Sequence, residues 1–153
     1  MRVLPCAVLV LVPVLIAAQE DKEKWQRVYT GEDSIIEIEL SKVTFVEYNV
    51  SKKVTFASTR VGRVKFRTIM SKPEALKEKP AVKYKTRLET IEFNCAAKRY
   101  RLYEASLFDD KGKLIKTYPW EPSAAWREVR FGSMMEKLVV PACKLIEEKR
   151  RNP

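Results

Sequence analysis

The chain has 153 residues and a mass of 17.8 kDa, which fits one ordinary domain and is too little for two sizeable ones. Its hydrophobic fraction of 46% and charged fraction of 33% are typical of a folded globular protein. The formal net charge is +10, and the sequence contains no histidine. The lack of histidine excludes Ser-His-Asp and Cys-His catalysis, histidine-bearing zinc sites and haem held by histidine.

Residues 1–18 predict a secretory signal peptide, because a positively charged start is followed by an almost wholly apolar run that ends at Gln19. A membrane anchor is the alternative. Spanning a bilayer takes about 20 apolar residues, however, and this run is shorter and holds two prolines. We therefore expect an exported chain with a single mature domain over residues 19–153 and no membrane span after cleavage. Cys6 precedes the end of the apolar run, so we expect no lipid anchor.

The mature chain alternates apolar and polar residues with a period of two, which is typical of half-buried strands. The apolar positions change parity near Glu89 and Thr90, so we expect a β-bulge there. Pro73, Pro80 and many charges predict a loop over residues 71–81. The strand-like segments are residues 25–29, 36–40, 43–50, 54–56, 64–68, 82–95, 99–108 and 113–118, with a short edge piece in residues 126–131.

Two connections in the second half of the chain have recognisable composition. Residues 109–112 read Asp-Asp-Lys-Gly, which predicts a hairpin turn. Trp120 and Trp126 flank a proline-containing connection. This connection either packs over the end of the sheet or forms an exposed recognition loop.

The C-terminal segment changes to a helical period. Ser133 and Glu136 have the spacing of a capping box, and Pro141 is expected to kink the helix or divide it in two. The residues at helical spacing are Met135, Leu138, Val139, Ala142, Leu145 and Ile146. The whole pattern predicts an α+β fold, an antiparallel sheet with a C-terminal helix packed on one face.

Two cysteines, Cys95 and Cys143, remain in the mature chain. An even pair in an oxidising compartment predicts a disulfide. A zinc site is the weaker alternative because no histidine or further cysteine accompanies the pair. A redox pair is also weaker, since such pairs are usually spaced C-x-x-C. The disulfide would tie the helix to the end of a central strand.

A set of features occurs in a fixed order along the mature chain. They are Trp25, Ile91-Glu92-Phe93-Asn94-Cys95, Arg99-Tyr100-Arg101, Asp110-Lys111-Gly112, Trp126, Ser133-Met134-Met135-Glu136-Lys137-Leu138 and Cys143. This order resembles the bacterial surface-adhesin protein E-like family over about residues 25–144. The resemblance implies an antiparallel sheet of about six strands, a C-terminal helix tied to it by the disulfide, no enzyme activity and a role as a surface protein or adhesin.

The positive charge is concentrated in residues 51–101, which hold 15 Lys and Arg against 4 Asp and Glu. If the strands involved are neighbours, their basic residues form one patch on the solvent side. Such a patch would attract lipopolysaccharide phosphates, acidic glycans or acidic protein surfaces. The alternative is a solvated outer face that prevents sheet edges from pairing. The predicted anion-binding residues are Arg63, Lys65, Arg67, Lys83, Lys85 and Arg87.

Other functions have weaker support. The acid pairs Glu37/Glu39 and Asp109/Asp110 fit a strand face and a turn rather than a catalytic cleft, so we expect no enzyme, cofactor or metal site. Export argues against a nucleic-acid partner. Two hypotheses stay open. One is an exported binding protein for host-matrix or envelope polyanions, periplasmic or at the cell surface. The other is a structural envelope protein, dimeric through a strand edge, without a diffusible ligand.

Overall fold

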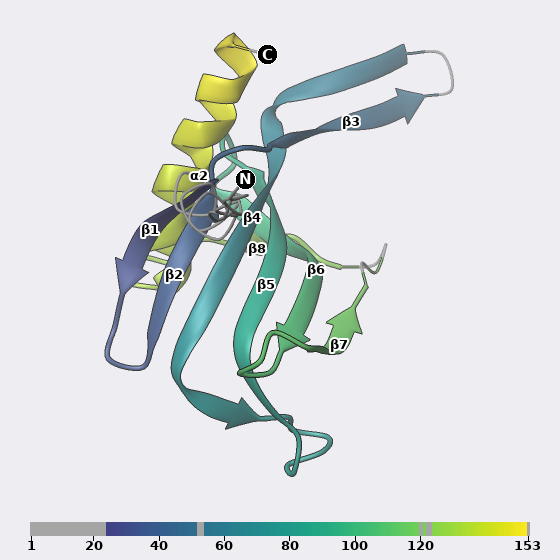
Figure 1. The fold of residues 1–153 in the computed structure, drawn as a ribbon. Helices are drawn as coiled ribbons and strands as arrows, with labels where there is room; N and C mark the ends of the chain where they lie inside the picture. Colours follow the sequence, from purple (N-terminus) through teal and green to yellow (C-terminus); the bar gives the residue numbers. More distant parts are fainter. Residues whose placement is uncertain (1–23, 52–53, 120, 122–123, 153) are drawn as a thin grey trace, which may run out of the picture.

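The computed structural model describes residues 24–51, 54–119, 121 and 124–152, and within residues 47–60 it describes the backbone. The predicted signal peptide lies outside these residues. The described chain forms one sheet and one long helix (Figure 1). The elements are β1 (Trp25–Thr30), β2 (Ser34–Glu39), β3 (Thr44–Ser51), β4 (Val54–Ala75), β5 (Lys83–Asn94), β6 (Arg99–Phe108), β7 (Leu114–Tyr118), β8 (Arg127–Glu128) and α2 (Met134–Arg151).

The sheet is antiparallel throughout, and six of its strands follow the order β1-β2-β4-β5-β6-β7. The two remaining strands share an edge with a neighbour: β3 pairs with the first half of β4, and β8 pairs with the start of β6. Because β4 is so long, β3 and the start of β4 project beyond the sheet as a two-stranded arm (Figure 1). The predicted α+β fold is confirmed.

The main core lies between α2 and the sheet. Alternate residues of β2, β4 and β5 point to the helix, as the period-two pattern predicts. The Phe66 and Phe93 rings meet edge to face with centroids 6.0 Å apart, and burial of each such side chain is worth about 1.5–3 kcal/mol. The buried members are Ile36, Ile38, Val64, Phe66, Ile91 and Phe93 from the sheet and Leu138, Ala142, Leu145 and Ile146 from α2.

The predicted capping box begins α2. The Ser133 Oγ accepts a hydrogen bond from the Glu136 N–H at 3.3 Å, while the Glu136 carboxylate accepts from the Gly132 N–H at 2.7 Å. The predicted division at Pro141 is wrong, because one helix runs through it. Leu138 and Ala142 are buried against the sheet on either side of Pro141, so tertiary packing offsets the lost backbone hydrogen bond.

The predicted disulfide joins Cys95, directly after β5, to Cys143 of α2, with an S–S distance of 2.08 Å. The helix also approaches the backbone of β4 closely. A Cβ at Gly62 would lie 2.9 Å from the Ile146 Cγ1. This glycine therefore permits the close approach of helix and sheet that the disulfide secures.

A second, smaller cluster lies beyond the helix, where the ends of β4 and β5 extend below it (Figure 1). It consists of Met70, Leu76, Tyr84 and Leu107. The loop predicted for residues 71–81 is wrong for its first part, because β4 continues to Ala75. Pro73 is tolerated there because it falls between Ile69 and Glu74, where the pairing with β5 is interrupted.

The β-bulge predicted at Glu89 and Thr90 is found on the neighbouring strand. The pairing of β5 with β4 continues there without a shift. In the pairing of β5 with β6, however, Thr90 lies opposite Glu104 and the next residue, Ile91, lies opposite Leu102. The extra residue is therefore Tyr103 of β6. As a result β5 keeps its alternation, and Glu89 stays on the same face as Ile91.

The predicted turn between β6 and β7 is confirmed. The Asp109 carboxylate accepts hydrogen bonds from the N–H groups of Lys111 and Lys113. Gly112 has a φ of 78°, which a residue without a side chain adopts at little cost.

Candidate functional site

The face of the sheet that points away from α2, here called the open face, carries a row of charged side chains. The strand register places Arg63 of β4, Glu92 of β5 and Arg101 of β6 opposite one another. Val64, Ile91 and Phe93, which adjoin Arg63 and Glu92 in sequence, point to the helix and belong to the core. The same alternation that builds the core therefore assembles a three-strand charge row on the other side.

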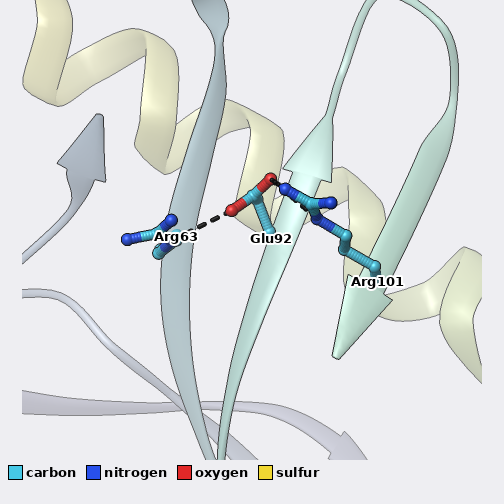
Figure 2. A network of polar contacts seen from close by, with 3 residues as sticks. All are labelled: Arg63, Glu92 and Arg101. Carbon is cyan, nitrogen blue, oxygen red and sulfur yellow. Dashed lines mark hydrogen bonds and ion pairs between the residues drawn. The ribbon is translucent and has the colours of Figure 1, made fainter. Parts of the chain in front are cut away.

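Glu92 is the centre of this row, and its side chain is 0% exposed. Figure 2 shows its carboxylate between two guanidinium groups. The Arg63 Nε donates to Oε2 at 2.9 Å, and the Arg101 Nε and Nη2 donate to Oε1 at 3.0 and 2.7 Å. A buried carboxylate is costly unless it is paired and hydrogen-bonded. The two arginines meet this need and leave the trio with one net positive charge.

The guanidinium groups of three open-face arginines stack on aromatic rings. A guanidinium stacked on a ring gains about 0.5–1 kcal/mol at an exposed site and loses rotational freedom. These side chains are therefore fixed in position while their charge is retained. The stacked pairs, with the distance from guanidinium carbon to ring centroid, are Arg63 on Tyr103 (3.7 Å), Arg67 on Trp25 (4.5 Å) and Arg101 on Trp126 (4.7 Å).

Glu39 forms a second charged cluster on the open face. Burial raises the pKa of Glu39, but hydrogen bonds from Lys24 and Ser41 and the charges of Lys24 and Lys65 outweigh this, so its pKa lies below the ordinary value. The Lys24 Nζ lies 3.0 Å from the carboxylate and the Lys65 Nζ 3.9 Å. Glu39 therefore stays ionised and orients two lysines.

A small hollow of about 160 Å³ lies between these two clusters. Three cationic and two acidic side chains reach it, with Tyr103 forming part of the wall. Its size suits a single anionic group, such as a sulfate, phosphate or carboxylate on a larger partner. The lining residues are Glu39, Lys42, Thr44, Arg63, Lys65, Thr90, Tyr103 and Glu104.

The structure separates the six residues predicted to bind anions. Arg63, Lys65 and Arg67 lie together on the open face. Arg87 pairs in register with Thr68, a buried neighbour of Phe66, and so points to the helix side. The prediction that Arg87 shares a face with the β4 cations is therefore wrong. The odd-numbered residues 63, 65 and 67 of β4 pair with even-numbered residues of β5, so the odd-numbered Arg87 points to the other face. Lys83 and Lys85 lie near the far end of β5, where the Lys85 Nζ donates to the Ser71 carbonyl at 2.9 Å.

Arg87 is engaged with Glu89 on the helix side. The Arg87 Nε lies 3.1 Å from Glu89 Oε2, yet this buried Nε has no hydrogen bond to the described residues. Burial raises the pKa of Glu89, and the neighbouring positive charge of Arg87 only partly counters this. The pair thus combines an acid that resists ionisation with a donor that lacks a well-aligned acceptor.

Sequence reasoning missed Glu92, Arg101 and Trp126 as parts of the open face. A signal was present: Glu92 stands between the apolar residues Ile91 and Phe93, where a lone acid on a central strand needs basic cross-strand partners. Trp126 is half-buried and stacks on Arg101, which favours packing of its connection on the sheet. Trp120, at the other end of that connection, lies outside the described residues.

The described residues contain no group of three or more Cys, Asp or Glu side chains placed to hold a metal ion. None of the helices that they form is both long and apolar enough to cross a membrane.

The fold is an antiparallel sheet with a disulfide-tied helix, and the comparisons with known proteins give its family. The model of the surface-adhesin protein E family matches residues 25–144. The chain therefore belongs to the surface-adhesin protein E family, as its sequence resemblance predicts.

A solved structure agrees with this assignment. Haemophilus influenzae protein E matches with a TM-score of 0.54 and 10% sequence identity, over 82% of this chain and 87% of that chain. At this identity the likeness shows a shared fold and carries no residue-level function. None of the curated proteins matches the chain.

Proposed function

We propose that the chain is an exported, non-enzymatic surface or envelope protein that binds an anionic partner on its open face. Membership of the surface-adhesin protein E family supports the adhesive role. The observation that supports the binding mode is the set of arginines held by Glu92 and by aromatic rings (Figure 2). Fixed guanidinium groups bind sulfate, phosphate and carboxylate well because little freedom is lost on binding.

The charge balance of the open face favours an anion over a cation. Its cationic side chains outnumber its acidic ones, so a surplus of positive charge remains. The cations on or beside the face are Lys24, Arg27, Lys42, Arg63, Lys65, Arg67 and Arg101, and the acids are Glu37, Glu39, Glu92 and Glu104. A host-matrix or envelope polyanion fits this surface better than a neutral ligand does.

The binding experiment uses a sulfated oligosaccharide, a heparin fragment of defined length, as the polyanion. Its affinity for the full domain is measured by calorimetry at several salt concentrations. Substitution of the exposed Arg27 and Lys42 and the half-exposed Lys65 by glutamine removes three charges and leaves the Glu92 trio intact. We expect the triple variant to bind about tenfold more weakly and to show a shallower salt dependence.

A matched variant controls for net charge. Lys111, Lys113 and Arg151 are exposed and lie away from the open face, in the β6–β7 turn and at the end of α2. Their replacement by glutamine removes the same three charges. Equal losses in both triple variants would mean that binding depends on overall charge, and the open-face proposal would then be wrong.

Export is a separate part of the proposal, and it depends on residues 1–18. The intact mass of the native protein, measured in periplasm, outer membrane and medium, tests it. We expect a chain that begins near Gln19 and is two daltons lighter before reduction. A cytoplasmic chain that keeps residues 1–18 and has free thiols would overturn the proposed location.

The two-stranded arm favours a second candidate, a structural envelope protein that is dimeric and has no diffusible ligand. A two-stranded ribbon is marginally stable alone in water, and the arm of β3 and early β4 projects from the sheet (Figure 1). A second chain beside the arm would stabilise it. A concentration-dependent dimer by sedimentation, together with no binding of the heparin fragment, would favour this candidate.

A further inference from the structure

Phe131 is the most exposed large apolar side chain among the described residues, with 95% of its surface open to solvent. It stands between β8 and α2, in a turn that Gly132 completes with a φ of 73°. The Ser133 N–H and hydroxyl both donate to the Arg130 carbonyl, at 3.2 and 2.6 Å. The Gly132 N–H is held by the Glu136 carboxylate. The backbone therefore fixes Phe131 at the tip of a hydrogen-bonded turn.

Further apolar surface adjoins this ring. A shallow hollow of about 420 Å³ lies beside Phe131 and α2, and the Cys95–Cys143 disulfide forms part of its wall. Val140 of α2 is 69% exposed there, and Val129 and Val139 are half-buried. Exposed apolar side chains that gather in one place, with a polar rim, mark interaction sites.

Three segments build this surface, and each is tied to another. The Lys98 carbonyl, in the turn after β5, accepts a hydrogen bond from the Val129 N–H at 3.0 Å. The disulfide joins the same turn to α2, and the capping box joins the loop after β8 to the start of α2. A surface held in this way loses little freedom when a partner covers it. We call it the Phe131 patch, and its members are Lys98, Val129, Arg130, Phe131, Val139 and Val140.

The rim of the Phe131 patch carries a surplus of positive charge. Lys98 and Arg130 are exposed, and neither makes an ion pair with another residue that the structure describes. Glu136 is the acid that lines the hollow. Glu128, close to Arg130 in the chain, is compensated by Arg99 at 3.1 Å. An apolar centre with a cationic rim is the composition of a surface that docks on an anionic bilayer.

We propose that the Phe131 patch docks the protein on the surface of an anionic lipid bilayer. Phe131 and Val140 enter the boundary between headgroups and acyl chains, while Lys98 and Arg130 contact lipid phosphates. A bilayer suits a ring at the tip of a turn, because lipid can surround a projecting side chain on all sides. The open face supplies none of these residues, so the proposal does not depend on polyanion binding there.

The test measures sedimentation of the native protein with sucrose-loaded vesicles of equal parts phosphatidylglycerol and phosphatidylcholine. We expect saturable binding at low salt that vesicles of phosphatidylcholine alone do not reproduce. Phe131→Ser should weaken it about tenfold or more, because the ring supplies most of the buried apolar area. Lys98→Asn combined with Arg130→Gln should weaken it about twentyfold, which is about fivefold for each charge. Asparagine suits position 98, where φ is 49°.

Matched variants control for hydrophobicity and charge. Leu114→Ser removes an exposed apolar side chain at the start of β7, and Lys111→Gln combined with Lys113→Gln removes two exposed charges from the β6–β7 turn. Each should change vesicle binding by less than about twofold. Phe131→Ser should leave both the urea unfolding midpoint and the affinity for the heparin fragment unchanged, which separates docking from folding and from the open face. Residues 1–18 are common to all variants, so any binding of their own cancels in the comparison.

Equal vesicle binding by Phe131→Ser and the native protein would overturn the proposal. So would equal binding to neutral vesicles, the absence of binding to either kind, or equal losses in the matched variants. A dimer in sedimentation velocity that Phe131→Ser abolishes, without vesicle binding, would assign the Phe131 patch to a second copy of the chain instead.

Discussion

Removal of the Cys95–Cys143 disulfide is expected to destabilise the fold by about 4 kcal/mol. The two cysteines are 48 residues apart, and on the chain-entropy model closure of such a loop costs the unfolded chain about 14 cal/mol/K. Replacement of both cysteines by alanine frees the unfolded chain from this restriction. Because the cysteines are half-buried, the change in packing adds little. The loss comes mostly from greater freedom in the unfolded state.

Urea unfolding followed by circular dichroism measures this loss. With a slope of about 2 kcal/mol/M, the midpoint should fall by about 2 M. Reduction of the native protein should produce the same shift, which separates loss of the bond from loss of the side chains. A decrease below about 1 kcal/mol with an unchanged slope would contradict the loop-closure argument. It would show that the contacts of α2 already restrict the chain.

Three further substitutions test the charged and capping interactions. Glu92→Gln should cost about 2–3 kcal/mol in urea unfolding, because it leaves two guanidinium groups without their carboxylate; no loss would mean that ring stacking holds them. Ser133→Ala should cost about 1 kcal/mol through the lost helix cap, and an unchanged midpoint would contradict this. The pKa of Glu89 is raised in the folded state, so the folded chain binds the proton more tightly than the unfolded chain. Stability should therefore fall as the pH rises from about 4 towards the folded-state pKa. Glu89→Gln should remove this decline, as measured by the unfolding midpoint at each pH. A variant whose stability declines as much as that of the native chain would exclude Glu89 as the source.

The sequence predicts the elements better than it predicts the faces of the sheet. Alternation, the helical period, the Ser133–Glu136 cap and the two cysteines each act locally or through a simple pairing rule, and each is confirmed. The position of the bulge is different. A change from odd-numbered to even-numbered apolar positions indicates a β-bulge, but it does not show which of two paired strands holds the extra residue. That choice depends on neighbouring strands, and β6 takes the bulge at Tyr103.

The candidate site was only partly predictable for the same reason. Arg63, Lys65 and Arg67 were placed correctly on one face, because their spacing within one strand settles it. Whether Arg87 joins them depends on the register between β4 and β5. The register pairs Arg67 with Leu88, which sends Arg87 to the opposite side. The Glu92 trio joins three strands, so its prediction needs both the register of β4 with β5 and the register of β5 with β6.

The bulge in β6 also helps to build the open face. Tyr103, the extra residue, lines the small hollow, and its ring stacks on the Arg63 guanidinium at 3.7 Å. Arg63 in turn donates a hydrogen bond to Glu92. The irregularity that the sequence could not assign to one strand therefore supplies a ring that holds one end of the Glu92 trio.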